Sequence, residues 1–196
     1  MSILIQTELA GKINNLPGFK SEALLPVFEA VVNSIQAIED RGTPTGKGKV
    51  TVFIHRESQK ALSEEFEREK SIHSFEIEDD GVGFDDVNYG AFCTADTTHK
   101  LARGCKGIGR FYWLKAFESV EIRSVYKDGD NRYFRELRFT REKGFEELRR
   151  EVTDKPQKTS IRLVGYKREY REQPSSFKTT PKIAQRILEH CLSFFI

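Results

Sequence analysis

Cysteine is scarce in this chain, and its spacing excludes two common kinds of site. The 196 residues contain only three cysteines, Cys93, Cys105 and Cys191, and no two of them form a C-x-x-C pair. An odd number of widely spaced cysteines argues against a disulfide framework. Cys93, His99 and Cys105 also match no zinc-ligand spacing. A reducing compartment fits this cysteine usage, and we therefore expect a cytoplasmic location.

Long apolar runs and a surplus of one charge are also absent. No window approaches the roughly 20 apolar residues of a membrane span. The amino-terminal MSILIQTELAGK lacks the basic start and apolar core of a signal peptide, so we expect no membrane partner. The formal net charge is only +2, so the composition does not indicate nucleic-acid binding by this domain. A nucleic-acid partner would have to be bound through a region downstream of it.

What the sequence does contain predicts one α+β domain. Apolar residues recur every three or four positions from Leu25 to Ile38, which predicts a helix that begins near Pro26 and ends at Gly42. Further helices are predicted over residues 107–117 and from 181 onward, and residues 57–70 form a charged loop or short helix. Residues 90–104 lack periodicity and predict a mobile loop. Strands are predicted over residues 48–56, 73–80 and 159–166, with a hairpin over 119–140 around KDGDN.

This order of elements predicts a two-layer α/β sandwich. The sheet is expected to be mixed but mostly antiparallel, with helices on one of its faces. One domain is expected over residues 1–178. Residues 179–196 would begin a C-terminal helix that leads into a downstream region, because the final CLSFFI leaves hydrophobic surface uncovered.

The stretch RGCKGIGRFYWLKAF, residues 103–117, indicates a loop that binds phosphate. Its glycines follow the pattern G-x-x-G-x-G at Gly104, Gly107 and Gly109. A P-loop is excluded because Arg110 follows the last glycine, and a dinucleotide fingerprint is excluded because the glycine order is reversed. Glycines before a helix expose free N–H groups to an anion, and Lys106 adds positive charge. The alternative is a flexible hinge.

Glu29 and Asn33 lie four residues apart, so their side chains leave the same face of the first helix one turn apart. An asparagine amide oxygen is a hard ligand that suits Mg²⁺. A carboxylate one turn away could orient and deprotonate a water molecule. The alternative is a solvated pair on an exposed helix face.

Directly after the second strand, EIEDDGVGF contains D-x-G-x-G at Asp79, Gly81 and Gly83. An aspartate at a strand end can accept a hydrogen bond from an exocyclic amine. The glycines permit close approach of backbone and ligand. The alternative is an ordinary turn, since Asp-Gly is a strong turn signal. An EF-hand is excluded because Val87 occupies the position of the closing glutamate.

Taken in order, E-x-x-x-N, D-x-G-x-G and G-x-x-G-x-G resemble the GHKL ATPase superfamily. That superfamily includes gyrase B-type topoisomerases, MutL-type repair proteins, the ninety-kilodalton heat-shock chaperones, sensor histidine kinases and MORC-type ATPases. The late stretch KTSIRL resembles the family's G-T-x-V strand, with Thr159 as the matching threonine and Lys158 where glycine is usual. The resemblance covers about residues 22–165.

The resemblance implies the Bergerat fold, which binds ATP or ADP with Mg²⁺. By position, Glu29 resembles the general base and Asn33 the Mg²⁺ ligand. Asp79 resembles the carboxylate that reads adenine, with support from Thr159, and Gly81 and Gly83 would form the floor beneath the adenosine. A lid is implied at about residues 93–106. The remaining residues that the resemblance assigns to the lid and the phosphate loop are Thr98, Lys100, Gly104, Lys106, Gly107, Ile108, Gly109, Arg110 and Phe111.

The resemblance also implies a function. We expect slow, Mg²⁺-dependent ATP hydrolysis that drives a conformational switch or a nucleotide-dependent homodimer of a larger protein. Glu29 favours hydrolysis over the phosphotransfer of sensor kinases, which usually carry asparagine there. GCKGIGRFYWLKAF most resembles bacterial ATP-binding proteins of loosely defined role. The alternative is a nucleotide-sensing module that binds ATP or ADP without significant turnover.

Overall fold

The computed structural model describes residues 8–44, 46–57, 71–94, 108–176 and 179–194. Within these ranges six strands form one antiparallel sheet in the spatial order β1-β2-β6-β3-β4-β5. The strands are β1 (Val50–Arg56), β2 (Ile72–Asp79), β3 (Phe117–Asp128), β4 (Asn131–Thr140), β5 (Gly144–Val152) and β6 (Lys158–Tyr166). The late strand β6 therefore lies between the early β2 and the central β3.

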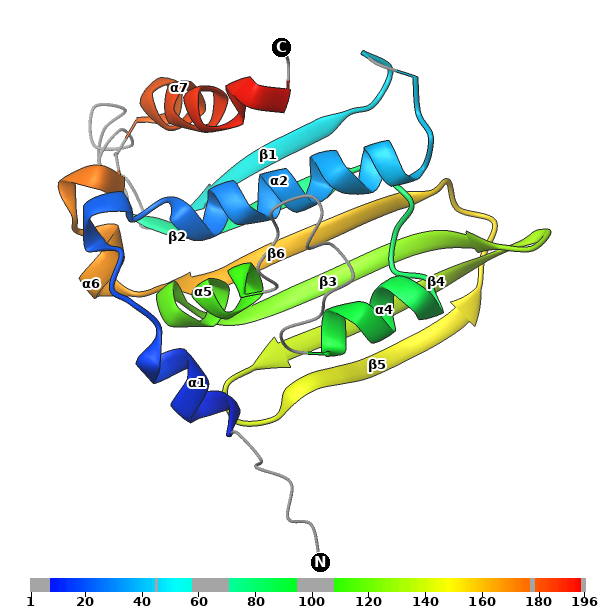
Figure 1. Cartoon of the computed structure of the whole chain (residues 1–196), viewed down its shortest axis with the longest axis horizontal. Helices are drawn as coiled ribbons and strands as arrows, with labels where there is room; N and C mark the ends of the chain where they lie inside the picture. Colours follow the sequence, from blue (N-terminus) through cyan, green and yellow to red (C-terminus); the bar gives the residue numbers. More distant parts are fainter. Residues whose placement is uncertain (1–7, 45, 58–70, 95–107, 177–178, 195–196) are drawn as a thin grey trace, which may run out of the picture.

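The helices lie on one side of the sheet (Figure 1). The longest, α2, covers β2, and α5 covers β3. The expected two-layer α/β sandwich is thus confirmed, although every strand pairing in the described chain is antiparallel rather than mixed. The helices are α1 (Leu9–Asn15), α2 (Leu25–Asp40), α4 (Asp86–Cys93), α5 (Gly109–Ala116), α6 (Arg168–Arg171) and α7 (Thr180–Cys191), with short 3₁₀ turns at Lys20–Glu22, Pro174–Ser176 and Leu192–Phe194.

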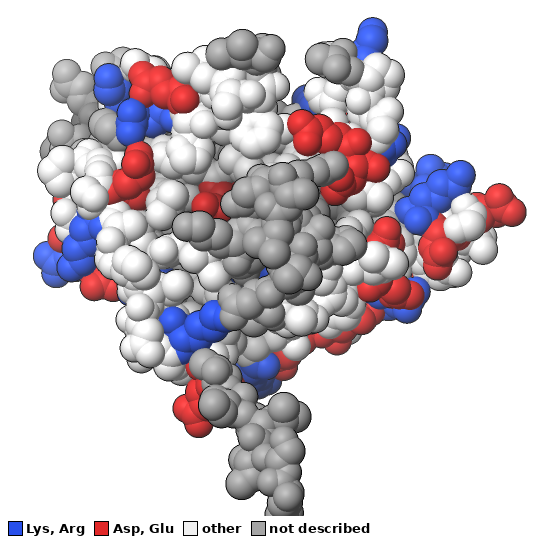
Figure 2. All heavy atoms as spheres, in the orientation of Figure 1, with Lys and Arg blue, Asp and Glu red and all other residues white. Residues whose placement is uncertain are grey.

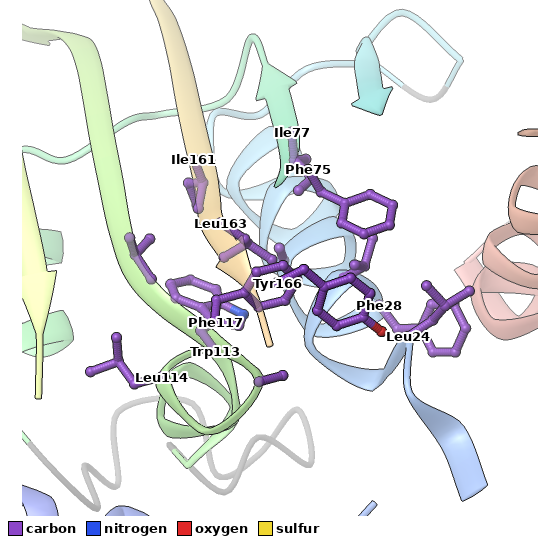
Figure 3. Close-up of a cluster of buried hydrophobic side chains, with 14 of the residues drawn as sticks. Leu24, Phe28, Phe75, Ile77, Trp113, Leu114, Phe117, Ile161, Leu163 and Tyr166 are labelled. Carbon is purple, nitrogen blue, oxygen red and sulfur yellow. The ribbon is translucent and has the colours of Figure 1, made fainter. Parts of the chain in front are cut away.

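The core lies between the helices and the central strands, and large aromatic side chains fill it (Figure 3). The Phe117 ring stacks on Tyr166 with ring centres 4.6 Å apart. The rings of Phe75 and Phe117 meet edge to face, with centres 6.2 Å apart. Burying each such side chain contributes about 1.5–3 kcal/mol. This core fixes α2 and α5 against the sheet, and both helices border the site described below.

The face of the sheet away from the helices carries paired charges instead of a second core. One row across five strands alternates in sign, from Glu76 through Arg162, Glu121 and Arg138 to Glu146. Opposite charges in register on neighbouring strands stabilise the sheet modestly. The helix side likewise mixes both signs across the residues coloured in Figure 2. Among the helices described, none combines the length and the apolar character that a membrane crossing requires.

Most of the predicted elements are confirmed. The predicted first helix is α2, with Pro26 in its first turn and Gly42 beyond its end at a φ of 72°. The predicted hairpin is β3–β4, where pairing of Asp128 with Asn131 leaves a two-residue turn that contains Gly129 at a φ of 58°. A two-residue turn with positive φ matches the twist of the flanking strands.

Two predictions were wrong in part, and one strand was not predicted. Residues 90–93, expected in a loop, form the end of α4, whose first turn is capped by the Asp85 carboxylate accepting from the Asn88 N–H at 2.7 Å. The helix expected over 107–117 ends at Ala116, because Phe117 already belongs to β3 and packs in the core. The strand β5 was not predicted, because its charged sequence GFEELRREV shows little alternation. Residues 58–70 lie outside the described chain.

Gly81 packs directly on the backbone of α2, and this close approach predicts a stability effect. A Cβ at position 81 would lie 2.6 Å from the carbonyl carbon of Ala37 and 2.8 Å from its oxygen. Backbone cannot yield cheaply, so we expect Gly81→Ala to lower the free energy of unfolding by about 1–3 kcal/mol. Chemical denaturation measures this difference.

Gly90→Ala is the matched control. Position 90 lies within α4 and has open space around its Cβ. Alanine there should be neutral or stabilising by up to about 1 kcal/mol. Equal stability of Gly81→Ala and wild type would mean that α2 and residue 81 are farther apart than described.

Candidate functional site

One cavity of about 170 Å³ lies between the helices and the sheet. Its walls come from α2, from the loop that follows β2, from α4, from the start of α5 and from β6. The residues that line it are Asn33, Ser34, Gln36, Ala37, Asp40, Asp79, Val82, Gly83, Phe84, Asn88, Ala91, Phe92, Gly109, Arg110, Trp113, Thr159 and Ile161. Three of the sequence motifs, widely separated along the chain, therefore meet at one hollow.

Asp79 is the buried acid of this cavity. It is the last residue of β2, and only 4% of its surface is exposed. The Ser34 hydroxyl donates to its Oδ2 at 2.8 Å, and the Gly81 N–H donates to its Oδ1 at 2.9 Å. In the described part of the chain no lysine or arginine pairs with it. A carboxylate offers about four acceptor positions, two on each oxygen. The two donors occupy one position on each oxygen, so each oxygen keeps one for a ligand.

Burial raises the pKa of Asp79 from 3.8 to about 6, against the opposing hydrogen bonds from Gly81 and Ser34. Loss of hydration disfavours the charged form, and no lysine or arginine in the described ranges offsets this loss. The carboxyl group is consequently ionised at neutral pH at a cost in stability. A buried carboxylate without a cation is an acceptor suited to an N–H donor from a bound molecule.

The loop Asp80–Phe84, termed the glycine loop here, is held by other elements rather than by itself. The Val82 N–H donates to the carbonyl of Ala37 in α2 at 2.9 Å. The Gln157 side chain donates to the carbonyls of Gly81 and Val82 at 3.0 and 2.9 Å. A solvent-exposed turn would satisfy these groups with water. The reading of Asp79-Gly81-Gly83 as an ordinary turn therefore does not describe this loop.

The second half of the glycine loop is held as firmly. Gly83 has a φ of 81°, and the Asn88 side chain donates to its carbonyl at 3.1 Å. The Phe84 N–H donates to the Ser124 hydroxyl at 3.0 Å, and Arg135 donates to the Phe84 carbonyl at 2.7 Å. The backbone that faces the cavity is therefore fixed before any ligand binds.

Four polar side chains form a buried polar row across the helix side of the sheet. Asp79, Thr159, Ser124 and Arg135 lie in direct register on β2, β6, β3 and β4, and each is 4% exposed or less. The hydroxyls of Ser124 and Thr159 are 2.9 Å apart and share a hydrogen bond. Asp79 and Thr159 reach the cavity, while Ser124 and Arg135 lie behind the glycine loop.

Glu29 and Asn33 leave α2 toward the start of α5. Asn33 lines the cavity, whereas Glu29 lies one turn away and is half-buried against Gly109. Burial raises the pKa of the Glu29 carboxyl. A Cβ at position 109 would lie 2.1 Å from Glu29 Oε2, so only glycine leaves room for the carboxylate there. The E-x-x-x-N pair is therefore not a solvated pair on an open helix face.

The residues assigned to the start of α5 divide into two groups. Gly109 and Arg110 line the cavity, and Ile108 precedes the helix. Phe111 is buried in the core and does not line the cavity. Arg110 donates to the Thr94 carbonyl at 2.6 Å, which ties the end of α4 to the start of α5.

Five assigned residues, and with them nearly all of the expected lid, lie outside the described residues: Thr98, Lys100, Gly104, Lys106 and Gly107. The same holds for His99 and Cys105, so the zinc spacing considered above is not placed either. Within the described ranges, no three His, Cys, Asp or Glu side chains gather as a metal site. An Mg²⁺ ion held by one asparagine and by phosphate oxygens would need no such cluster.

Sequence reasoning missed the residues that support the site. Ser34 follows Asn33 directly, and its position on the face of α2 toward β2 was open to prediction from helical spacing. Ser124, Arg135 and Gln157 gave no such signal, because their roles depend on strand register and on a loop after β5. No family model matches the sequence, and no curated protein matches it either.

The size and lining of the cavity limit what it can enclose. Its volume is below the roughly 300–1,000 Å³ of pockets that enclose a whole drug-sized ligand. It combines apolar walls, such as Phe92 and Ile161, with a buried acceptor at Asp79. A flat heterocycle with an exocyclic amine suits this combination.

The buried charge of Asp79 predicts a stability gain on its removal. Because the folded-state pKa of about 6 exceeds 3.8, stability falls as pH rises from about 4 to about 6. We expect Asp79→Asn to raise the free energy of unfolding at pH 7 by up to about 3 kcal/mol, the equivalent of that shift. Ligand-free denaturation at several pH values measures it.

The difference between the two proteins should become small below about pH 3, where wild-type Asp79 is protonated in the folded state and largely in the unfolded state. If Asp79→Asn is less stable than wild type at pH 7, the inference that the charge of Asp79 is uncompensated is wrong. That result would indicate a cation supplied by residues beyond the described ranges.

Proposed function

We propose that this chain is the nucleotide-binding domain of a Mg²⁺-dependent ATPase of the GHKL type. The observation that carries the proposal is the buried carboxylate of Asp79, which pairs with no lysine or arginine of the described residues, in a cavity wall that also carries apolar side chains. The order of motifs along the chain supplies the family resemblance, and in the structure those motifs border one cavity. Slow hydrolysis would reset a conformational or dimerisation switch in a larger protein.

Asp79 binds the exocyclic amine of the base in this proposal. The Ser34 hydroxyl and the Gly81 N–H occupy one lone pair on each oxygen and thereby fix the direction of those that remain. Thr159 lies beside Asp79 in register and adds a hydroxyl to the same wall. Phe84 and Phe92, whose rings meet edge to face with centres 5.0 Å apart, form an apolar wall against which the base packs.

Glu29 acts as the general base, and Asn33 binds the Mg²⁺ ion through its amide oxygen. The ion would neutralise phosphate charge when bound. Partial burial raises the pKa of Glu29, which makes its carboxylate a better proton acceptor for a water molecule. Gly109 leaves the space that this carboxylate occupies, at the first residue of α5.

Calorimetric titration with ADP and a non-hydrolysable ATP analogue, with and without Mg²⁺, tests the proposal. We expect Mg²⁺-dependent binding to wild type and its loss in Asp79→Asn, because an amide cannot replace both carboxylate acceptors. Glu29→Gln should bind ADP within about threefold of wild type and lose at least about 100-fold in turnover, the usual loss with a general base.

Glu29→Gln keeps the shape of the side chain and serves as its own folding control. Binding with no turnover in wild type would favour the alternative, a module that senses nucleotide without hydrolysing it. Failure of wild type to bind either nucleotide would refute the proposal.

Gly109→Ala should lower turnover as Glu29→Gln does, although residue 29 itself is unchanged. The added methyl group would collide with Oε2 of Glu29, which is the free end of a flexible side chain. The carboxylate would rotate away at little cost in stability, and a shift of about 1 Å can lower the rate about 100-fold. We expect turnover to fall while the melting temperature stays nearly unchanged.

Gly90→Ala, which adds a methyl group into open space, is the matched control and should keep wild-type turnover. Full activity of Gly109→Ala would contradict the assignment of Glu29 as the base.

A further inference from the structure

Phe84 is held at both of its backbone polar groups by buried side chains from the sheet. Ser124 accepts from its N–H at 3.0 Å, and Arg135 donates to its carbonyl at 2.7 Å. Both side chains are 1% exposed, and neither lines the cavity. Phe84 itself lines the cavity, so both residues act on the cavity wall through its backbone without lining the cavity themselves.

Arg135 is itself held rigidly. Its guanidinium donates to Asp86 at the start of α4 and to Glu147 in β5. The same group lies over the rings of Tyr89 and Tyr126, at 4.7 and 5.1 Å from their centres. A planar guanidinium with several fixed partners offers its remaining N–H groups in one direction. The bond to Phe84 is thus part of a rigid network.

Ser124 connects the glycine loop to the cavity wall on β6. Its oxygen accepts from Phe84 and shares a hydrogen bond with the Thr159 hydroxyl, which lines the cavity. Gly83 also depends on Ser124, because a Cβ at position 83 would lie 2.8 Å from the serine oxygen. One small side chain thereby sets the positions of two segments that meet the ligand.

We propose that Ser124 and Arg135 are positioning residues that clamp Phe84 and so set the affinity of the cavity for its ligand without touching that ligand. The inference rests on the proposed function, since the ligand is taken to be a nucleotide whose base contacts Phe84. The clamp acts on the base end of the site. Glu29 and Gly109, which act on the phosphate end, remain untouched by it.

The test compares Ser124→Ala and Arg135→Lys with Ile122→Val. Ile122 lies two residues from Ser124 on the same face of β3, is fully buried and does not line the cavity. Alanine removes the acceptor of the Phe84 N–H, and lysine offers one nitrogen in place of the two with which Arg135 bonds Phe84 and Asp86. Three readouts are used: the ADP dissociation constant, the KM and kcat for ATP, and hydrogen exchange of the Phe84 amide by NMR.

We expect both variants to bind ADP about tenfold or more weakly, as loss of one buried hydrogen bond predicts. KM should rise with kcat unchanged, because the catalytic end is intact. The Phe84 amide should exchange at least about tenfold faster in Ser124→Ala, because its acceptor is gone. Ile122→Val should match wild type in ADP affinity and in Phe84 exchange.

Wild-type ADP affinity in Ser124→Ala and Arg135→Lys would overturn the inference, as would a fall in kcat with KM unchanged. If wild type binds no ADP, the proposed function fails and amide exchange alone decides the clamp. Protection of the Phe84 amide from exchange that is lost in Ser124→Ala but kept in Ile122→Val would then support the clamp. Equal exchange in all three proteins would overturn it.

Discussion

The backbone N–H and C=O groups of a loop that is largely removed from water need hydrogen-bond partners, and this requirement governs the architecture around Asp79. The glycine loop makes few of these bonds within itself. Its partners are a carbonyl of α2, a side chain of α4, two side chains of the sheet and Gln157 from the connection before β6. The position of the cavity wall therefore depends on the placement of α2, α4, β3 and β4 and of the connection before β6.

The same region is costly to the free energy of folding. Asp79, which no described lysine or arginine neutralises, and Arg135 are both removed from water within one row of the sheet. Hydrophobic side chains in their place would pack at lower cost. Strain and buried charge of this kind gather where a site must be ready before its ligand arrives. The aromatic core between α2, α5 and β6 supplies the stability that offsets this cost.

Sequence reasoning succeeded where local patterns decide the structure. The period of α2, the alternation of β2 and the turn at Gly129 are local signals, and all three elements formed as predicted. The order of motifs also placed Asn33, Asp79 and Thr159 at one cavity. Helix α4 was missed because DVNYGAFC has only a weak apolar face and contains Gly90. Ser124 and Arg135 were missed because their meaning arises only from register between strands that are far apart in sequence. What these residues do with a nucleotide stays a prediction.

The glycine loop also has a consequence for the order in which the chain can fold. Its partners Ser124, Arg135 and Gln157 lie 40 to 76 residues further along the chain. During synthesis the loop therefore emerges long before the groups that hold it, and its final shape must await the pairing of β6 with β2 and β3. Contacts of such long range form late and slow the folding of a domain. The cavity is thus among the last features to be completed, and a ligand that binds there reports on the assembly of the whole sheet.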